Sequence, residues 1–220
     1  IRQDLAAIKN NRYISVGADV APAGFVSFDK FIQTASKNEP PDPNLTDNDV
    51  YNIMYSSGTT GSPKGIIHTH HIRSCYCTLF ASSFRMSPES IILHTGALVF
   101  NGAMMGFMPW MYLGCRYILH KTYDPKRIIE EIESSQVTHI ILVPSQIVEL
   151  LNHQDFDPSR LTSLEMITSL GAPLLMEYKN KFKQLLPNRF YELYGLTEGF
   201  ITCLDKNDAL QKPRSVGVPI

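Results

Sequence analysis

The residues that could do chemistry gather first in one short loop, "YSSGTTGSPKG" at residues 55–65. Its glycines let the backbone turn N–H groups inward, its hydroxyls add further donors, and Lys64 supplies a positive charge. Such a loop can surround phosphate oxygens. The Walker pattern is not matched, because its second glycine falls on Pro63 and Lys64 is followed by Gly65. The residues alone leave two interpretations open, a phosphate-binding loop and a solvated Ser/Gly turn.

A second candidate segment is "YELYGLTEG" at residues 191–199. It places Tyr194, Thr197 and Glu198 on a tight turn after a predicted strand. A carboxylate beside a phosphate loop is repelled unless a cation lies between them, and Mg²⁺ is commonly held by one carboxylate plus phosphate oxygens. Tyr194 offers a flat face to a purine. The alternative is an exposed turn glutamate with a tyrosine in the core.

Strands and helices alternate along the chain, which predicts an α/β fold with a mostly parallel β-sheet flanked by helices. In such sheets ligands bind beyond the carboxyl ends of strands, and both candidate loops are expected there. Lys179, Lys181 and Lys183 are expected on the solvated face of the helix at 174–186. The predicted strands cover 13–16, 51–55, 91–95, 115–119, 137–143, 164–168 and 189–194. The predicted helices cover 27–32, 102–112, 145–151 and 174–186, with two more starting after Thr69 and Asp124.

Composition indicates a protein with a packed core, since 44% of its 220 residues are hydrophobic and 19% are charged. A net charge of −1 gives no basic field, which disfavours nucleic acid as a partner. Four cysteines without a C-x-x-C pair favour reduced thiols and a cytoplasmic location. Residues 95–115 carry no charge, but glycines and Pro109 interrupt them. A buried strand-turn-helix is therefore favoured over a membrane span.

Five segments resemble motifs of the adenylate-forming superfamily, which includes acyl-CoA synthetases, luciferases and the adenylation domains of peptide synthetases. The loop at 55–65 resembles its signature loop, and "YGLTE" resembles its adenine and Mg²⁺ motif. The chain resembles a fatty acyl-CoA ligase most. The other three segments are "VTHIILVPSQ", "SLGAPL" and "SVGVPI", in the family's order.

The resemblance implies a role for each matching residue. ATP phosphates would contact the first loop, and adenine would contact the later segments with Tyr194 stacked on it. Thr197 would touch the α-phosphate, Glu198 would hold Mg²⁺, and Lys64, Thr197 and Glu198 would form the catalytic set. The full set expected to bind ATP is Ser56, Ser57, Gly58, Thr59, Thr60, Gly61, Lys64, Gly171, Ala172, Pro173, Tyr194, Gly195 and Thr197.

The implied reaction activates a carboxylic acid as an acyl-adenylate and passes the acyl group to coenzyme A. Many family members carry an aromatic–His pair before the acyl pocket, whereas this chain has Asn101 there. No carboxylate lies between residues 95 and 115, so we expect a plain acid rather than an amino acid, and the Met-rich wall favours a fatty acid. The expected substrate contacts are Asn101, Met104 and Met105.

The resemblance covers residues 51–220, so we expect a partial N-terminal segment and linker at 1–48 and part of the ATP- and acyl-binding domain at 49–220. The family's small C-terminal lid domain is expected to be absent, and the chain alone to be largely inactive. The complete enzyme could contact a membrane peripherally. Two rivals remain, an adenylation domain of a carrier-protein system and a non-catalytic nucleotide-binding module.

Overall fold

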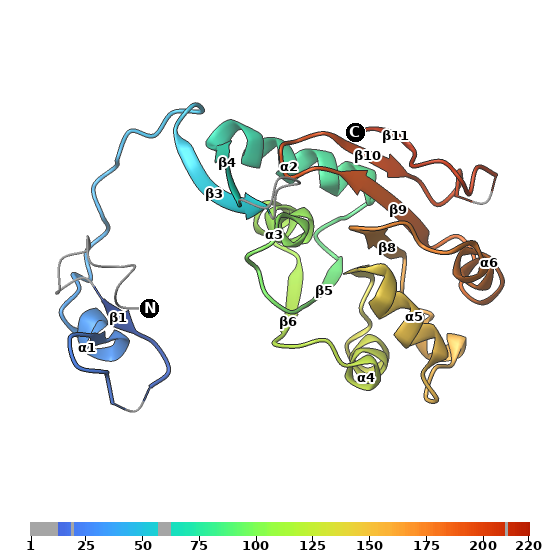
Figure 1. Cartoon of the computed structure of the whole chain (residues 1–220), viewed down its shortest axis with the longest axis horizontal. Coiled ribbons are helices and arrows are strands. Elements are labelled where there is room, and N and C mark those ends of the chain that lie inside the picture. Colours follow the sequence, from blue (N-terminus) through green and yellow to red (C-terminus); the bar gives the residue numbers. More distant parts are fainter. Residues whose placement is uncertain (1–12, 19, 57–62, 210) are drawn as a thin grey trace. The chain divides into compact units, whose positions relative to one another are not determined.

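A computed structural model describes residues 13–18, 20–56, 63–209 and 211–220. The chain forms two compact units, Ile1–Leu45 and Thr46–Ile220. In the first unit, β1 (Ile14–Ser15) pairs in parallel with β2 (Val26–Ser27), and α1 (Phe28–Gln33) follows directly (Figure 1). The Ser27 hydroxyl caps α1 by accepting from the Lys30 N–H.

A seven-stranded sheet organises the second unit, in the order β11-β10-β9-β8-β7-β5-β6. The five strands from β9 to β6 run parallel, and β10 and β11 add antiparallel at one edge. This confirms the predicted α/β fold with a mostly parallel sheet. The strands are β5 (Ile91–Thr95), β6 (Arg116–His120), β7 (His139–Leu142), β8 (Met166–Leu170), β9 (Phe190–Gly195), β10 (Ile201–Leu204) and β11 (Val218–Pro219).

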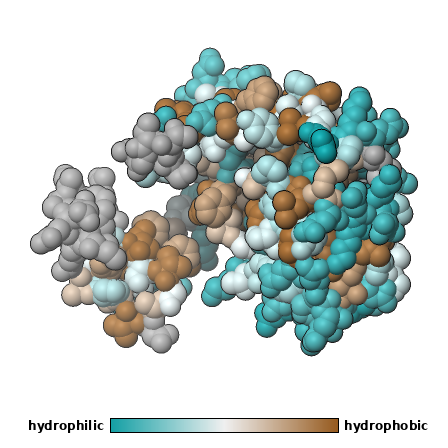
Figure 2. Space-filling model, turned by 45° about the vertical axis from the view of Figure 1, so that its right-hand side comes forward, coloured by the Kyte–Doolittle hydropathy of each residue, from teal (hydrophilic) through white to brown (hydrophobic). Residues whose placement is uncertain are grey.

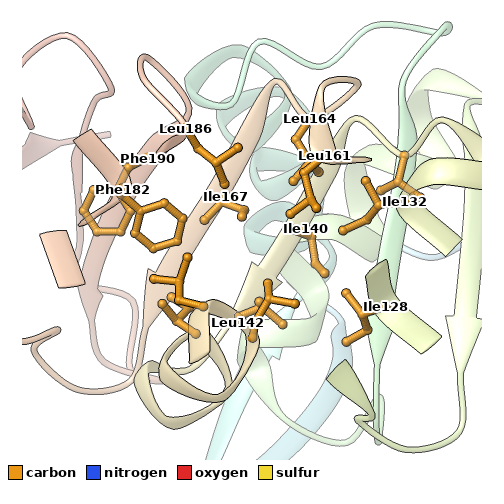
Figure 3. Packing of buried hydrophobic residues seen from close by; sticks show 14 of the residues in the cluster. Ile128, Ile132, Ile140, Leu142, Leu161, Leu164, Ile167, Phe182, Leu186 and Phe190 are labelled. Atoms are coloured by element: carbon orange, nitrogen blue, oxygen red, sulfur yellow. The ribbon is translucent and has the colours of Figure 1, made fainter. Parts of the chain in front are cut away.

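Helices cover both faces of the sheet. Neighbouring residues of each strand point to opposite faces, so each strand contributes to the core on both sides. Ile92 and Met166 pack with residues of α2 and α3, whereas Leu93 and Ile167 pack with residues of α4, α5 and α6. Figure 3 shows the cluster that contains Ile167, in which strand residues pack against side chains of the covering helices. The helices are α2 (His70–Ser83), α3 (Asn101–Leu113), α4 (Pro125–Ser135), α5 (Pro144–Asn152) and α6 (Met176–Leu185), with a short 3₁₀ helix at Pro158–Leu161.

The candidate phosphate loop does not follow a strand of this sheet. It joins β3 (Val50–Ser56) to β4 (Lys64–Thr69), which form a separate antiparallel pair beside α2 and α3 (Figure 1). The expectation that the loop lies beyond a parallel strand is therefore wrong. The apolar strand at 51–55 is correctly predicted, but its residues do not encode the strand with which it pairs.

Helix starts follow local signals as expected. The Thr69 hydroxyl accepts from the Ile72 N–H at 3.4 Å, and Asp124 accepts from the Arg127 N–H at 3.0 Å before Pro125. The region 95–115 folds as the end of β5, a loop and α3. Within the described ranges, no helix combines the length and apolar character required to cross a bilayer.

The predicted lysine face of α6 is wrong for two of its three members. Lys179 forms an ion pair with buried Glu192 of β9, and Lys181 donates to the Leu151 carbonyl at 3.0 Å. Lys183 is exposed as expected. Elsewhere, Figure 2 shows hydrophilic residues covering much of the larger unit's visible face, with separate apolar residues between them.

Candidate active site

A cleft of about 380 Å³ brings together four segments that are far apart in the sequence. They are the end of β3, the first turn of α3, the end of β8 with Gly171, and the turn between β9 and β10. Tyr55 and Ser56, the first two residues of one candidate loop, thus border the same cavity as Gly195, Leu196 and Thr197 of the other. Its lining is Met54, Tyr55, Ser56, Val99, Phe100, Asn101, Gly102, Met105, Leu170, Gly171, Leu193, Gly195, Leu196, Thr197 and Ile201.

A direct hydrogen bond connects the β3–β4 pair to the turn after β9. His68 in β4 is 1% exposed, and its Nε2 donates to the Thr197 carbonyl at 2.8 Å. Burial lowers the pKa of His68 below its usual value, against the opposing effect of this hydrogen bond. The neutral ring therefore carries its proton on Nε2, and its buried Nδ1 has no partner among the described residues.

The turn after β9 needs glycine at two positions. A Cβ on Gly195 would lie 2.8 Å from the Phe200 carbonyl oxygen, and Gly199 has φ +113°. The Leu196 N–H donates back to the Phe200 carbonyl at 2.9 Å, which closes the turn. Thr197 lies inside this turn, so its position is fixed by the backbone on both sides.

The structure places the expected ATP residues as follows. Ser56 ends β3 opposite Lys64, the first residue of β4, so both flank the intervening loop. Tyr194 is 47% exposed, packs edge-on against Phe200 at 6.2 Å between ring centroids, and does not line the cleft. Gly171, with φ +91°, lines the cleft. Ala172 and Pro173 are exposed beside Gly171. Ser57, Gly58, Thr59, Thr60 and Gly61 lie outside the described residues.

Glu198 lies on the far side of the same turn. It borders a second hollow of about 290 Å³ together with residues of α2, among them His71 and Cys75. Within the described parts of the chain, no three His, Cys, Asp or Glu side chains gather as a metal site. Glu198 offers one carboxylate at this place, and Mg²⁺ is commonly held by one or two carboxylates together with phosphate oxygens.

Two of the three expected substrate contacts reach the cleft. Asn101 and Met105 line it, whereas Met104 is buried in the core and does not. A neighbouring cavity of about 490 Å³ shares Phe100, Gly102 and Leu170 with the cleft. Its other walls come from the ends of β5 and β7 and from α5, and they are mostly apolar. The cleft thus offers polar groups at Ser56, Asn101 and Thr197, and the neighbouring cavity extends it with mostly apolar walls.

Two polar supports of the cleft were not found from the sequence. Arg73 of α2 donates to Asn101 Oδ1 at 2.9 Å. Its spacing from Tyr76 and Phe80 (i, i+3, i+7) places it on the buried face of α2, and this periodicity could have been read. The second support is Glu192, which accepts from the Leu174 N–H at 3.3 Å and so holds the segment that starts at Gly171.

Comparison with known proteins gives a consistent result. A family model described as AMP-binding enzyme matches residues 3–220. The chain is 29% identical to a feruloyl-CoA synthase from Amycolatopsis over 189 residues, covering 84% of this chain and 38% of that protein. It is 27% identical to an indoleacetate–CoA ligase from Aromatoleum aromaticum over 210 residues, covering 92% of this chain and 40% of that ligase. The chain thus spans about two fifths of the length of these relatives.

Solved structures share the fold. An o-succinylbenzoate CoA synthetase from Bacillus subtilis, in complex with an acyl-adenylate intermediate, superposes with a TM-score of 0.79 at 21% identity. The match covers 89% of this chain and 40% of that chain.

Proposed function

The chain belongs to the AMP-binding enzyme family of adenylate-forming proteins, and from this premise we propose that it is the ATP- and acid-binding portion of an acid–CoA ligase. One observation supports the proposal above the others: Ser56, Asn101, Gly171 and Thr197, from four distant segments, line one cleft. A solvated Ser/Gly turn or an isolated nucleotide loop would not require this convergence.

In the proposed reaction, a carboxylate oxygen attacks the α-phosphorus of ATP, and the bond to pyrophosphate breaks. An acyl-adenylate forms, and coenzyme A then displaces AMP through its thiol. Catalysis of phosphoryl-type transfer depends mainly on positioning and charge neutralisation. Lys64 and the loop before it would hold the β- and γ-phosphates, and Thr197 would contact the α-phosphate. Glu198 would hold Mg²⁺, which supplies positive charge to the phosphates.

The acid should have an apolar tail. The neighbouring cavity of about 490 Å³ is lined by Ile141, Leu142 and Leu170 among others. Gly102, which follows Asn101 in the sequence, lines both this cavity and the cleft. Such walls suit an alkyl or an aryl group. A fatty acid remains our prediction from the sequence. An aryl acid is the alternative, because two relatives are a feruloyl-CoA synthase and an indoleacetate–CoA ligase.

The test is pyrophosphate release by the protein that carries this chain, with ATP, Mg²⁺, coenzyme A and a panel of fatty and aryl acids. We expect acid-dependent release of pyrophosphate and formation of an acyl-CoA. Glu198→Gln should raise the Mg²⁺ concentration for half-maximal rate by about tenfold, since one charged ligand to the cation is lost. Glu177→Gln on α6 is the matched control, because Glu177 is exposed and borders neither the cleft nor the hollow at Glu198.

Two results would contradict the proposal. Absence of pyrophosphate release with every acid, in a folded protein that binds ATP, would favour the non-catalytic nucleotide-binding module. Acyl transfer to a carrier protein but not to coenzyme A would favour the carrier-protein adenylation domain.

A further inference from the structure

A positively charged side chain is buried directly behind the cleft wall. Arg73 of α2 is 1% exposed and is the largest of the fully buried side chains. Arginine is rarely buried to this degree unless an acid pairs with it. Among the described residues, no carboxylate lies within ion-pair distance of Arg73. Its guanidinium instead lies 4.8 Å from the centroid of the Tyr76 ring.

Its hydrogen-bond acceptors are all neutral. Nε donates to Asn52 Oδ1 at 3.0 Å, Nη1 donates to Asn101 Oδ1 at 2.9 Å, and Nη2 lies 3.5 Å from the sulfur of Met54. Met54 and Asn101 both line the cleft. The charge of Arg73 is therefore solvated by neutral groups, and Arg73 contacts two residues that line the cleft, Met54 and Asn101.

These contacts determine how Asn101 is oriented. A guanidinium has donors and no acceptor, so the Asn101 amide must turn its oxygen toward Arg73. Its Nδ2 then donates to the Tyr76 hydroxyl at 3.1 Å. The second N–H of that amide has no hydrogen-bond partner among the described residues, which leaves it available to a group in the cleft.

We propose that Arg73 is a positioning residue for the carboxylate of the acid substrate: it fixes Asn101 as an N–H donor and leaves the cleft wall with an unneutralised positive charge. The inference rests on the proposed function and adds to it where the carboxylate is recognised, namely at the α2–α3 wall rather than at the phosphate loop. A purely structural Arg73 would hold β3, α2 and α3 together and would not distinguish a carboxylate from a neutral analogue.

Two variants separate these roles. Arg73→Met keeps a long apolar stem and removes the charge, but it leaves the Asn52 and Asn101 amide oxygens without their donor, so its folding is checked by urea unfolding alongside binding. Asn101→Asp keeps the size of the side chain and gives Arg73 an ionic partner, but it removes the donor and neutralises the charge. Arg73→Lys retains the charge without the planar fork. Arg127→Met on α4 is the control for an exposed arginine.

Binding is measured by calorimetry on the protein that carries this chain, with octanoate and octanamide as one matched pair and ferulate and ferulamide as another. The wild type should bind the carboxylate of at least one pair about tenfold more tightly than the amide, as expected for a charge-assisted contact. Arg73→Met and Asn101→Asp should abolish that preference, Arg73→Lys should retain part of it, and Arg127→Met should retain all of it. In turnover, the KM for the acid should rise about tenfold in the first two variants while the KM for ATP changes less than about threefold.

The outcomes discriminate between the two proposals. A preference for the carboxylate that survives in both Arg73→Met and Asn101→Asp overturns the inference while the ligase function stands. Equal rises in the KM for acid and for ATP also overturn it, because they show a general loss of the site. A wild type without ligase activity contradicts the proposed function, yet loss of the carboxylate preference in the variants would still support the anion site. If the wild type binds none of the four probes, or shows no preference, the inference is wrong.

Discussion

Two side chains at the cleft have the direction of their hydrogen bonds imposed by a neighbour. The Thr197 carbonyl can only accept, so His68 must carry its proton on Nε2, and Arg73 can only donate, so Asn101 must present its oxygen. In each pair, one partner can act only as an acceptor or only as a donor, and this fixes the role of the other partner. The Asn101 amide therefore has its N–H donor oriented and the Thr197 turn is held in place before any ligand binds, which lowers the reorganisation needed on binding.

The contact of His68 with Thr197 gives a prediction at this scale. His68→Phe should destabilise the protein by about 1–3 kcal/mol, because the Thr197 carbonyl loses its buried donor. The same variant should lower adenylation, since the turn that carries Thr197 loses its link to β4. Chemical unfolding in urea and pyrophosphate release measure the two effects.

His68→Gln should restore most of both properties, since the glutamine amide also offers an N–H donor at the end of its side chain. Thr78→Ala is the control, because Thr78 is exposed on α2 and borders neither the cleft nor the hollow at Glu198. If His68→Phe is as stable and as active as Thr78→Ala, the hydrogen bond between β4 and the turn contributes to neither stability nor adenylation.

At the scale of elements, local signals were sufficient for most boundaries. The helix starts at Thr69 and Asp124-Pro125 and the strand at 91–95 are predicted correctly, because each depends on residues close in sequence. The strands β4 and β10 were missed. In β4, His68 interrupts the apolar pattern because it faces inward to bond Thr197, a partner 129 residues away. Sequence periodicity cannot show such a partner.

The same reason explains what was missed in the site. The loops at 55–65 and 194–199 are contiguous motifs and were found, whereas the wall formed by Arg73, Asn52 and Asn101 is assembled from three elements. An arginine in a predicted helix is normally assigned to the surface, so the prediction of Asn101 as a substrate contact did not include the buried arginine that orients it. Lys179 was misassigned for this reason too, since its partner Glu192 lies on β9.

The ion pair between Lys179 and Glu192 supports a prediction about how elements are connected. Their side chains are 10% and 6% exposed, Lys179 also donates to the Pro213 carbonyl at 2.9 Å, and Glu192 also holds the Leu174 N–H. The pair thus joins α6, β9, the segment after β8 and the chain near residue 213. Glu192→Ala should destabilise the protein by about 3–5 kcal/mol, because it leaves a buried lysine charge without a partner.

A double-mutant cycle tests this account by urea unfolding. The Lys179→Met and Glu192→Leu double variant should cost clearly less than the sum of the two single variants, since no uncompensated charge remains. Lys183→Met, one turn further along α6 and exposed, should be within about 0.5 kcal/mol of the wild type. Strict additivity of the two single changes would show that the pair is not coupled.

At the scale of the whole molecule, buried histidines link folding to pH. His139 in β7 is fully buried; its Nε2 donates to the Phe84 carbonyl at 3.0 Å, and Thr138 Oγ1 lies 2.7 Å from its Nδ1. Burial lowers the pKa of His139, and it likewise lowers the pKa of His68 and of His94. All three are therefore neutral in the folded protein near pH 7.

The sign of the pH effect follows from linkage. A histidine whose pKa is lowered by folding binds its proton more readily in the unfolded chain, so protons favour unfolding. Its stabilising contribution is fully present above the unfolded pKa of about 6.5 and is lost as pH falls from there through the folded pKa. We expect the free energy of unfolding to be flat between about pH 7 and 8 and to fall below about pH 6.5, with uptake of protons on unfolding.

Urea unfolding at pH 7.5 and pH 5.5 measures this loss, and the variant His139→Gln assigns part of it. Glutamine does not titrate in this range, so the variant should be less stable than the wild type at pH 7.5 but should lose less free energy on going to pH 5.5. Thr78→Ala removes an exposed side chain that does not titrate and should leave the pH dependence unchanged. Stability that rises from pH 7.5 to 5.5 would contradict the linkage, because it would require these rings to be charged inside the folded protein.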